Sequence, residues 1–191
     1  MTMPTPIIHA GRVRLRPFEP SDAELYRRWR ADAEPMALAG WNDRAPLSLA
    51  QSAARMNRLA TDQGKDYFTF LICLLADERP IGEVTLAELD RINGSAELGI
   101  FIGEVDEWGK GYGTDAINAI VGFGFAEQRL ERIWLEVWTE NARALRAYEK
   151  AGFVHEATLR NDRYEGGRYT SGHVMSILRD EWLSRSSPPA G

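Results

Sequence analysis

The sequence predicts a mixed α+β fold, in which a mostly antiparallel central sheet of about seven strands is flanked by about four helices. The predicted order is strand, two helices, three strands, helix, strand, helix and two strands. Three consecutive strands without an intervening helix exclude the regular strand–helix alternation of a doubly wound nucleotide-binding fold. With 191 residues, 44% of them hydrophobic, the chain has the size and apolar content of one domain with a substantial core.

The first third of the chain predicts one strand and two helices. Residues 12–16 alternate polar and apolar side chains, which is typical of a strand, and Pro17 ends it. Ser21 is expected to cap the first helix, with Glu24 as the reciprocal residue of a capping box. A second helix is expected over residues 48–61, after a loop at 40–46 that carries Trp41.

The middle and the end of the chain supply the remaining elements. Strands are expected at 67–75, 81–89 and 96–102, the last entered through an Asn93-Gly94 hairpin turn. Apolar residues at helical spacing predict a helix over 115–127, followed by a strand at 132–138. Asn141 caps a helix that runs to residue 150 and stops at Gly152. An antiparallel pair at 153–159 and 169–178 completes the sheet.

We therefore expect a single domain over residues 11–183. Residues 1–10 are interpreted as an N-terminal extension, and residues 184–191, rich in Ser and Pro, as a flexible tail. Residues 1–10 lack the basic and apolar regions of a secretory signal, and no apolar run reaches membrane-spanning length. One cysteine, Cys73, excludes an internal disulfide. The expected location is the cytoplasm, without a membrane partner.

The formal net charge of −5 argues against nucleic acid as a partner and mildly favours cationic small substrates. The histidines His9, His155 and His173 show no metal-binding spacing, so no metal is expected.

The most informative segment is the glycine-rich run at residues 108–114, between a strand-like segment and a long helix. Glycines at 109, 111 and 113 remove every Cβ from one face of a turn, so that a ligand can approach the backbone closely. The start of a helix also presents free N–H groups and the positive end of the helix dipole, which suit a diphosphate. The spacing matches neither a P-loop nor a dinucleotide fingerprint.

Two segments resemble signatures of the GNAT superfamily of N-acetyltransferases. Residues 108–114 resemble its pyrophosphate loop, although Trp108 stands where the superfamily prefers Gln or Arg. Residues 141–153 resemble its second signature, Asn-x-x-Ala-x-x-x-Tyr-x-x-x-Gly-Phe, at every defined position. Within the superfamily, the chain resembles the subgroup of ribosomal-protein alanine and spermidine N-acetyltransferases. This likeness is carried by the stretch from Arg160 to Tyr169 and by the closing Met-Ser-Ile-Leu of residues 175–178.

The resemblance implies a GNAT fold that binds acetyl-CoA and transfers its acetyl group to a primary amine of a small molecule or a protein N-terminus. It implies that Asn141 and Ala144 bind the pantetheine arm and that Tyr148 lies beside the thioester sulfur. It also implies a splayed strand whose main chain pairs with pantetheine, and a homodimer. The other implied cofactor-binding residues are Ile100, Phe101 and Ile102 on that strand, and Trp108, Gly109, Lys110, Gly111, Tyr112, Gly113 and Thr114 in the loop.

Acetyl transfer needs an acid to protonate the departing thiolate and a base to accept the proton of the amine. Tyr148 is the expected acid, and a main-chain N–H at Ile100 or Phe101 is expected to bind the oxyanion. Glu97 is the expected base, with Glu83, Glu156 or a water chain as rivals. Cys73 lies in an apolar run without an adjacent His, which favours a buried hydrophobe over a nucleophile.

Two other functions stay open at this point: an acyl-CoA sensor without turnover, and a nicotinamide-nucleotide enzyme. The acceptor amine also stays open, because acceptor pockets are built from variable loops.

Overall fold

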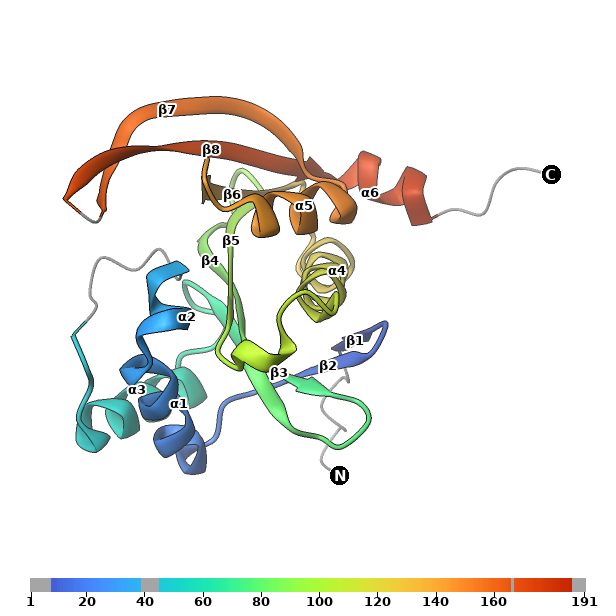
Figure 1. Cartoon of the computed structure of the whole chain (residues 1–191). Coiled ribbons are helices and arrows are strands. Elements are labelled where there is room, and N and C mark those ends of the chain that lie inside the picture. Colours follow the sequence, from blue (N-terminus) through green and yellow to red (C-terminus); the bar gives the residue numbers. More distant parts are fainter. Residues whose placement is uncertain (1–7, 39–44, 166, 187–191) are drawn as a thin grey trace, which may run out of the picture.

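The computed structural model describes residues 8–38, 45–165 and 167–186. Its centre is an eight-stranded sheet with the order β1-β2-β3-β4-β5-β6-β8-β7 (Figure 1). All neighbouring strands are antiparallel except β5 and β6, which are parallel. The mixed, mostly antiparallel α+β fold is thus confirmed. The strands are β1 Ile8–Ala10, β2 Val13–Arg16, β3 Phe68–Leu74, β4 Pro80–Asp90, β5 Ser95–Ile102, β6 Arg132–Trp138, β7 Val154–Glu165 and β8 Arg168–Leu178.

Helices cover both faces of this sheet. The first three pack on one face and α4 and α5 on the other, as Figure 1 shows. None of the helices in the described parts of the chain is long and apolar enough to cross a membrane. The α-helices are α1 Ala23–Ala31, α2 Ala33–Leu38, α3 Leu49–Thr61, α4 Tyr112–Ala126, α5 Ala142–Ala151 and α6 Arg179–Ser186, with short 3-10 turns at Pro20–Asp22 and Val105–Glu107.

Two apolar cores hold these layers together. The larger one joins α4 to the sheet, with Ile117, Ile120 and Phe125 of α4 at most 1% exposed. The smaller one lies under α1 and α3, where Trp29 and Met56 meet Phe101 of β5. Since successive side chains of a strand point to opposite faces, Leu98 of β5 packs in the larger core and Phe101 in the smaller one. The same alternation decides which residues of β5 face each side of the site.

The strand before the glycine-rich run separates from its neighbour, as predicted. β5 pairs with β6 only from Ser95 opposite Arg132 to Glu97 opposite Trp134. Beyond these positions β5 continues along β4, whereas β6 continues along β8. The two parallel strands therefore diverge, and the main chain of β5 after Glu97 has a side without a partner strand.

The N-terminal helix begins differently from the prediction. Ser21 does not cap it; instead Glu19 caps a 3-10 turn in a box with Asp22, and α1 starts at Ala23. Arg16 binds both carboxylate oxygens of Asp22 at 2.8 Å, which holds Asp22 in this role. Glu19 and Asp22, three residues apart, thus form the reciprocal capping box. The predicted capping pair of Ser21 and Glu24 was wrong.

Other boundaries also shift. The segment interpreted as an N-terminal extension contains β1, whose Ile8 lies opposite Leu15, and this strand makes the sheet eight-stranded. The first helical region is two helices, because Asp32 has an extended backbone between α1 and α2. At the other end α6 runs to Ser186, past the predicted start of the tail. Trp41 and its loop, and residues 187–191, lie outside the described residues.

Candidate active site

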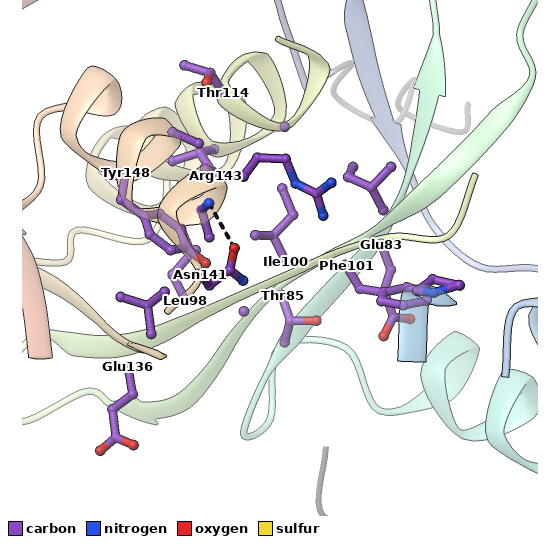
Figure 2. Close-up of a pocket in the computed structure, with 18 of the residues that line it drawn as sticks. Glu83, Thr85, Leu98, Ile100, Phe101, Thr114, Glu136, Asn141, Arg143 and Tyr148 are labelled. Carbon is purple, nitrogen blue, oxygen red and sulfur yellow. Dashed lines mark hydrogen bonds between the residues drawn. The ribbon is translucent and has the colours of Figure 1, made fainter. Parts of the chain in front are cut away.

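A cavity of about 800 Å³ opens where β5 and β6 diverge. On one side of β5 its wall is formed by the segment around residues 108–114 and by α5; on the other side, by β3, β4 and α3. Figure 2 shows this division: Thr114 and Arg143 lie on one side of β5, and Thr85 and Glu83 on the other. The gap in the sheet thus joins two compartments, which we name the α5 side and the α3 side.

The glycine-rich run ends at the N-terminus of α4. Gly111 is the N-cap residue of this helix, with φ +90° and no side-chain cap. Within the described residues, the main-chain N–H groups of positions 109–114 donate no hydrogen bond to a protein acceptor. A Cβ at Gly109 would meet nothing within 4 Å, so the space in front of this backbone is open. A row of free N–H groups at a helix N-terminus can bind an anion such as a diphosphate.

The residues of this run differ in whether they line the cavity. Gly109, Gly111, Gly113 and Thr114 line the cavity, whereas Lys110 and Tyr112 are not on its wall. The ammonium group of Lys110 lies 3.0 Å from Glu107, and the ring of Tyr112 lies under the guanidinium of Arg12 at 4.7 Å. Lys110 and Tyr112 therefore offer only main-chain groups to a ligand.

Trp108 connects the separated strand to α5. Its indole N–H donates a hydrogen bond of 2.9 Å to the carbonyl of Ile102, at the end of β5. The Arg143 guanidinium stacks on its ring, 3.7 Å from the centroid. Arg143 lines the cavity, so a cation stands beside the loop although Trp108 replaces the Gln or Arg of the superfamily. The spacing of the sequence motif leaves this position undefined, which is why Arg143 was not predicted.

The second signature places two side chains of α5 on the cavity wall. Asn141 is the N-cap of α5, and its Oδ1 accepts a hydrogen bond of 3.1 Å from the Ala144 N–H (Figure 2). This bond fixes the amide, so the Nδ2 donors remain for a ligand. Two turns on, the Tyr148 side chain is 6% exposed, lines the cavity and makes no hydrogen bond to another described residue. Burial raises the pKa of Tyr148, so its hydroxyl stays protonated.

The main chain of β5 presents alternate residues to the gap. The Gly103 N–H donates to the Ile81 carbonyl beside β4, at 2.9 Å. N–H and C=O directions alternate along a strand. The main-chain N–H and C=O of Phe101 therefore also face β4, whereas those of Ile100 and Ile102 face the gap. The Trp108 indole already uses the carbonyl of Ile102. Ile100 therefore has the main-chain N–H best placed for a ligand in the gap.

Two of the three candidate bases lie on the α3 side of the cavity. Burial raises the pKa of Glu97, and the nearby charges of Glu88 and Glu136 raise it further. Glu83 is 4% exposed, and burial raises its pKa despite the neighbouring Arg55 guanidinium, 3.7 Å away. The Oε2 of Glu83 has no hydrogen-bond partner among the described residues.

Glu156 does not belong to this site. Its carboxylate forms a two-point ion pair with Arg132, at 2.6 and 2.5 Å, and accepts a hydrogen bond from Ser176. The Arg132 hydrogen bonds lower the pKa of Glu156 to about 2. It links β7 to β6 and β8 through Arg132 and Ser176, and it is absent from the cavity wall, so it does not act as a base there.

The surroundings of Cys73 do not favour a nucleophile. Cys73 is fully buried, and burial raises the pKa of its thiol, so it behaves as a small apolar side chain. Within residues 8–38, 45–165 and 167–186 no group of three or more His, Cys, Asp and Glu side chains is placed to hold a metal ion. Two histidines, His155 and His173, hydrogen-bond to each other on the β7–β8 hairpin.

Several cavity residues on the α3 side were not predicted. Arg55 and Arg58 reach the wall from α3, and Gly99 forms part of its floor on β5. A Cβ at Gly99 would meet nothing within 4 Å. Charged residues at helical spacing read as a solvated face in the sequence, so only the packing of α3 over the sheet reveals that these arginines border a cavity.

Comparisons with known proteins agree with this geometry. The model of the acetyltransferase (GNAT) domain family matches residues 12–154. The chain is 26% identical to the spermidine N(1)-acetyltransferase of Escherichia coli K12 over 180 residues, 94% of this chain and 93% of that protein. It is 26% identical to the N-acetyltransferase p20 of Bacillus licheniformis over 92% of this chain and 97% of that protein.

The structure superimposes on the crystal structure of the spermidine N-acetyltransferase from Vibrio cholerae in complex with CoA and spermine. The TM-score is 0.81 at 28% identity, over 90% of this chain and 98% of that one. The family model covers most of the chain. The chain belongs to the acetyltransferase (GNAT) family and is an N-acetyltransferase, an enzyme that transfers an acetyl group to an amine.

Proposed function

We propose that this enzyme transfers the acetyl group of acetyl-CoA to a primary amine by direct attack, with both substrates bound at once. The observation that carries the proposal is the row of free N–H groups at positions 109–114, which opens onto the same cavity as Tyr148. A diphosphate on these amides leaves the pantetheine arm to follow the open side of β5, in the manner of an added strand. Acetyl-CoA supplies the activated acetyl group.

The residues of the α5 side fit such a cosubstrate. Gly109, Gly111 and Gly113 leave the backbone open to a diphosphate, and Arg143 adds a cation beside it. Asn141 can donate its amide N–H to a pantetheine carbonyl, because its own oxygen is used by the helix cap. Ala144 lines the same wall and is small enough to let the arm pass.

Tyr148 is proposed as the general acid. Its hydroxyl has no hydrogen-bond partner among the residues that the structure describes. The Tyr148 side chain lines the cavity and keeps its proton at neutral pH, because burial raises its pKa. A neutral hydroxyl facing a departing thiolate can donate its proton without a competing interaction. The Ile100 N–H faces the same gap and is proposed to bind the oxyanion, in preference to Phe101, which faces β4.

Glu97 is proposed as the base. It lies at the last position of β5 that pairs with β6, on the α3 side from which an amine can approach the gap. A carboxylate with a raised pKa accepts a proton near neutral pH more readily than an ordinary one. Unlike Glu83, which is buried beside Arg55, Glu97 is partly exposed and can pass the proton to solvent.

The test is release of free CoA thiol from acetyl-CoA in the presence of a panel of amines, with binding of CoA measured separately. Amine-dependent thiol release supports the proposal. Binding of CoA with no thiol release from any amine would favour an acyl-CoA sensor without turnover. Thermal stabilisation of the protein by NAD(P) but not by CoA would contradict acetyl-CoA as the cosubstrate.

We further propose a homodimer in the cytoplasm, without a nucleic-acid or membrane partner. The support is the resemblance to the family, the net charge of −5 and the single cysteine. Sedimentation of the purified protein at two concentrations tests the dimer, and a monomer at both would contradict it.

A further inference from the structure

The pairing of β7 with β8 brings two histidines and a threonine together at one edge of the sheet. Thr158 of β7 lies opposite His173 of β8, and His155 lies opposite Met175. Residues that stand opposite each other share a face of the sheet, and so do residues two apart on one strand. His155, Thr158 and His173 therefore share one face. The two histidines are 18 positions apart in the sequence, so their spacing did not indicate a common site.

The polar atoms of these three side chains form a triangle. The Nε2 of His155 lies 3.1 Å from the Nδ1 of His173 and 3.1 Å from the Oγ1 of Thr158, and the last two atoms are 2.9 Å apart. A closed ring of hydrogen bonds would require each atom to donate to one neighbour and to accept from the other. A ring nitrogen either carries a hydrogen or accepts one, so it cannot do both. At most two sides of the triangle can therefore have a hydrogen of their own.

The same triangle matches three donor atoms around one divalent transition metal ion. Two donors at about 90° to each other, each about 2.1 Å from a metal, are about 3.0 Å apart, which is close to the three sides. A metal at this distance on the axes of both imidazole rings would place the ring centroids about 4.8 Å apart. The centroids of His155 and His173 are 4.7 Å apart. The two rings thus have the separation of imidazoles that share one metal ion.

The chemistry of the donors selects the class of ion. Imidazole nitrogen suits nickel, copper and zinc, and nitrogen and oxygen donors at angles near 90° are typical of nickel and copper. Magnesium and calcium prefer sites built from oxygen alone, which these side chains do not provide. His155 and Thr158 are exposed and His173 is half-buried, so an ion can reach the three donors from solvent.

We propose that His155, His173 and Thr158 bind one divalent transition metal ion, which links β7 to β8. The two imidazoles are the strong donors and the hydroxyl oxygen is the weaker third. This site is separate from the proposed function, since these residues are absent from the cavity wall. In the described part of the chain β6 pairs with β8 no further than Gly172. The ion would therefore stiffen the hairpin just where it leaves β6 and continues to Arg163, which lines the cavity.

The experiment is a calorimetric titration of the tag-free, chelator-treated protein with Ni²⁺, and with Mg²⁺ as an ion that prefers oxygen donors. The variants are His155→Ala, His173→Ala and Thr158→Val, the last of which replaces the hydroxyl by a methyl group. His9→Ala is the matched control, because His9 is an exposed histidine of β1, at the opposite edge of the sheet. Melting temperatures of the metal-free proteins check folding and should agree within about 2 °C, because these side chains lie outside the core.

We expect wild type and His9→Ala to bind one Ni²⁺ per chain and no Mg²⁺. Each of His155→Ala and His173→Ala should weaken Ni²⁺ binding by at least about 10–100-fold, the loss that removal of an outer-shell partner already causes, and Thr158→Val by about tenfold. Saturating Ni²⁺ should raise the melting temperature of wild type but not of the two histidine variants, because it binds the folded hairpin.

Three results would overturn the inference. The first is the absence of saturable Ni²⁺ binding in wild type. The second is an affinity that does not change in His155→Ala, in His173→Ala or in Thr158→Val. The third is a loss of affinity in His9→Ala as large as the loss in the other two histidine variants.

Discussion

Adding one methyl group at Gly111 tests the anion site of the α4 N-terminus. Gly111 has φ +90°, where an L-residue with a Cβ is strained by about 1–2 kcal/mol. The added Cβ would also lie 2.9 Å from an Nη atom of Arg12, the end of a flexible side chain that can move. Gly111→Ala should therefore fold, with a melting temperature lower by about 2–8 °C for a chain of this length.

The effect on CoA should be larger than the effect on folding. Gly111 lines the cavity, so we expect the added methyl group to crowd the amides proposed to bind the diphosphate, and each charge-assisted hydrogen bond contributes about 1.5–3 kcal/mol. Loss of one such bond weakens CoA binding by about tenfold to more than a hundredfold. Isothermal titration with CoA measures this change, and thermal unfolding of the free protein measures the strain.

A matched control separates the two effects. Gly167, in the β7–β8 turn, has φ +85° and no atom within 4 Å of an added Cβ, and it is absent from the cavity wall. Gly167→Ala should show a similar loss of stability, because the backbone strain is the same, and an unchanged affinity for CoA. If Gly111→Ala binds CoA within a factor of about two of wild type, the loop amides do not hold the diphosphate and the reasoning fails.

Three further changes test the other parts of the site. Tyr148→Phe should lower kcat by about a hundredfold or more with an unchanged CoA dissociation constant; full activity would remove Tyr148 from the mechanism. In wild type the rate should fall on the acidic side of the pH–rate profile, at a pH above 4.5, because Glu97 must be deprotonated and its pKa is raised above that value. Glu97→Gln should abolish this acidic limb. Glu156→Gln is its control and should keep the limb, since Glu156 binds Arg132; a limb that survives in Glu97→Gln would point to another base. Gly99→Val should fill the floor of the α3 side and raise KM for the acceptor about tenfold or more, a loss of about 1.4 kcal/mol of binding free energy. CoA affinity and folding should stay intact, because an added Cβ meets no atom within 4 Å. An unchanged KM would show that the acceptor does not pass over Gly99.

The fold was predictable where local signals were strong. The hairpin at Asn93-Gly94 and the helix stop at Gly152 depend on backbone conformations that glycine favours, and both are present. β1 was missed because three residues carry too little pattern, and it is stabilised by pairing with β2. The choice of Glu19 over Ser21 as the cap depends on Arg16, whose position beside Asp22 only the folded chain defines.

The site was predictable on the α5 side and much less so on the α3 side. The glycine-rich run and a helix with Asn141 and Tyr148 at fixed spacing are local features, so the sequence contains them. The α3 side is assembled from segments far apart in the chain, such as Arg55 and Gly99, whose side chains meet only through the packing of α3 over the sheet. For the same reason the sequence favoured Glu97 as the base without excluding Glu83 or Glu156, whereas the ion pair with Arg132 and the absence from the cavity wall set Glu156 apart.

A crystal structure of the CoA complex tests the central claim most directly. The claim predicts diphosphate oxygens within hydrogen-bond distance of the N–H groups of residues 109–114, the pantetheine arm along Ile100 in the gap between β5 and β6, and the sulfur beside the Tyr148 hydroxyl. A diphosphate bound elsewhere, with these amides still facing solvent, would contradict it.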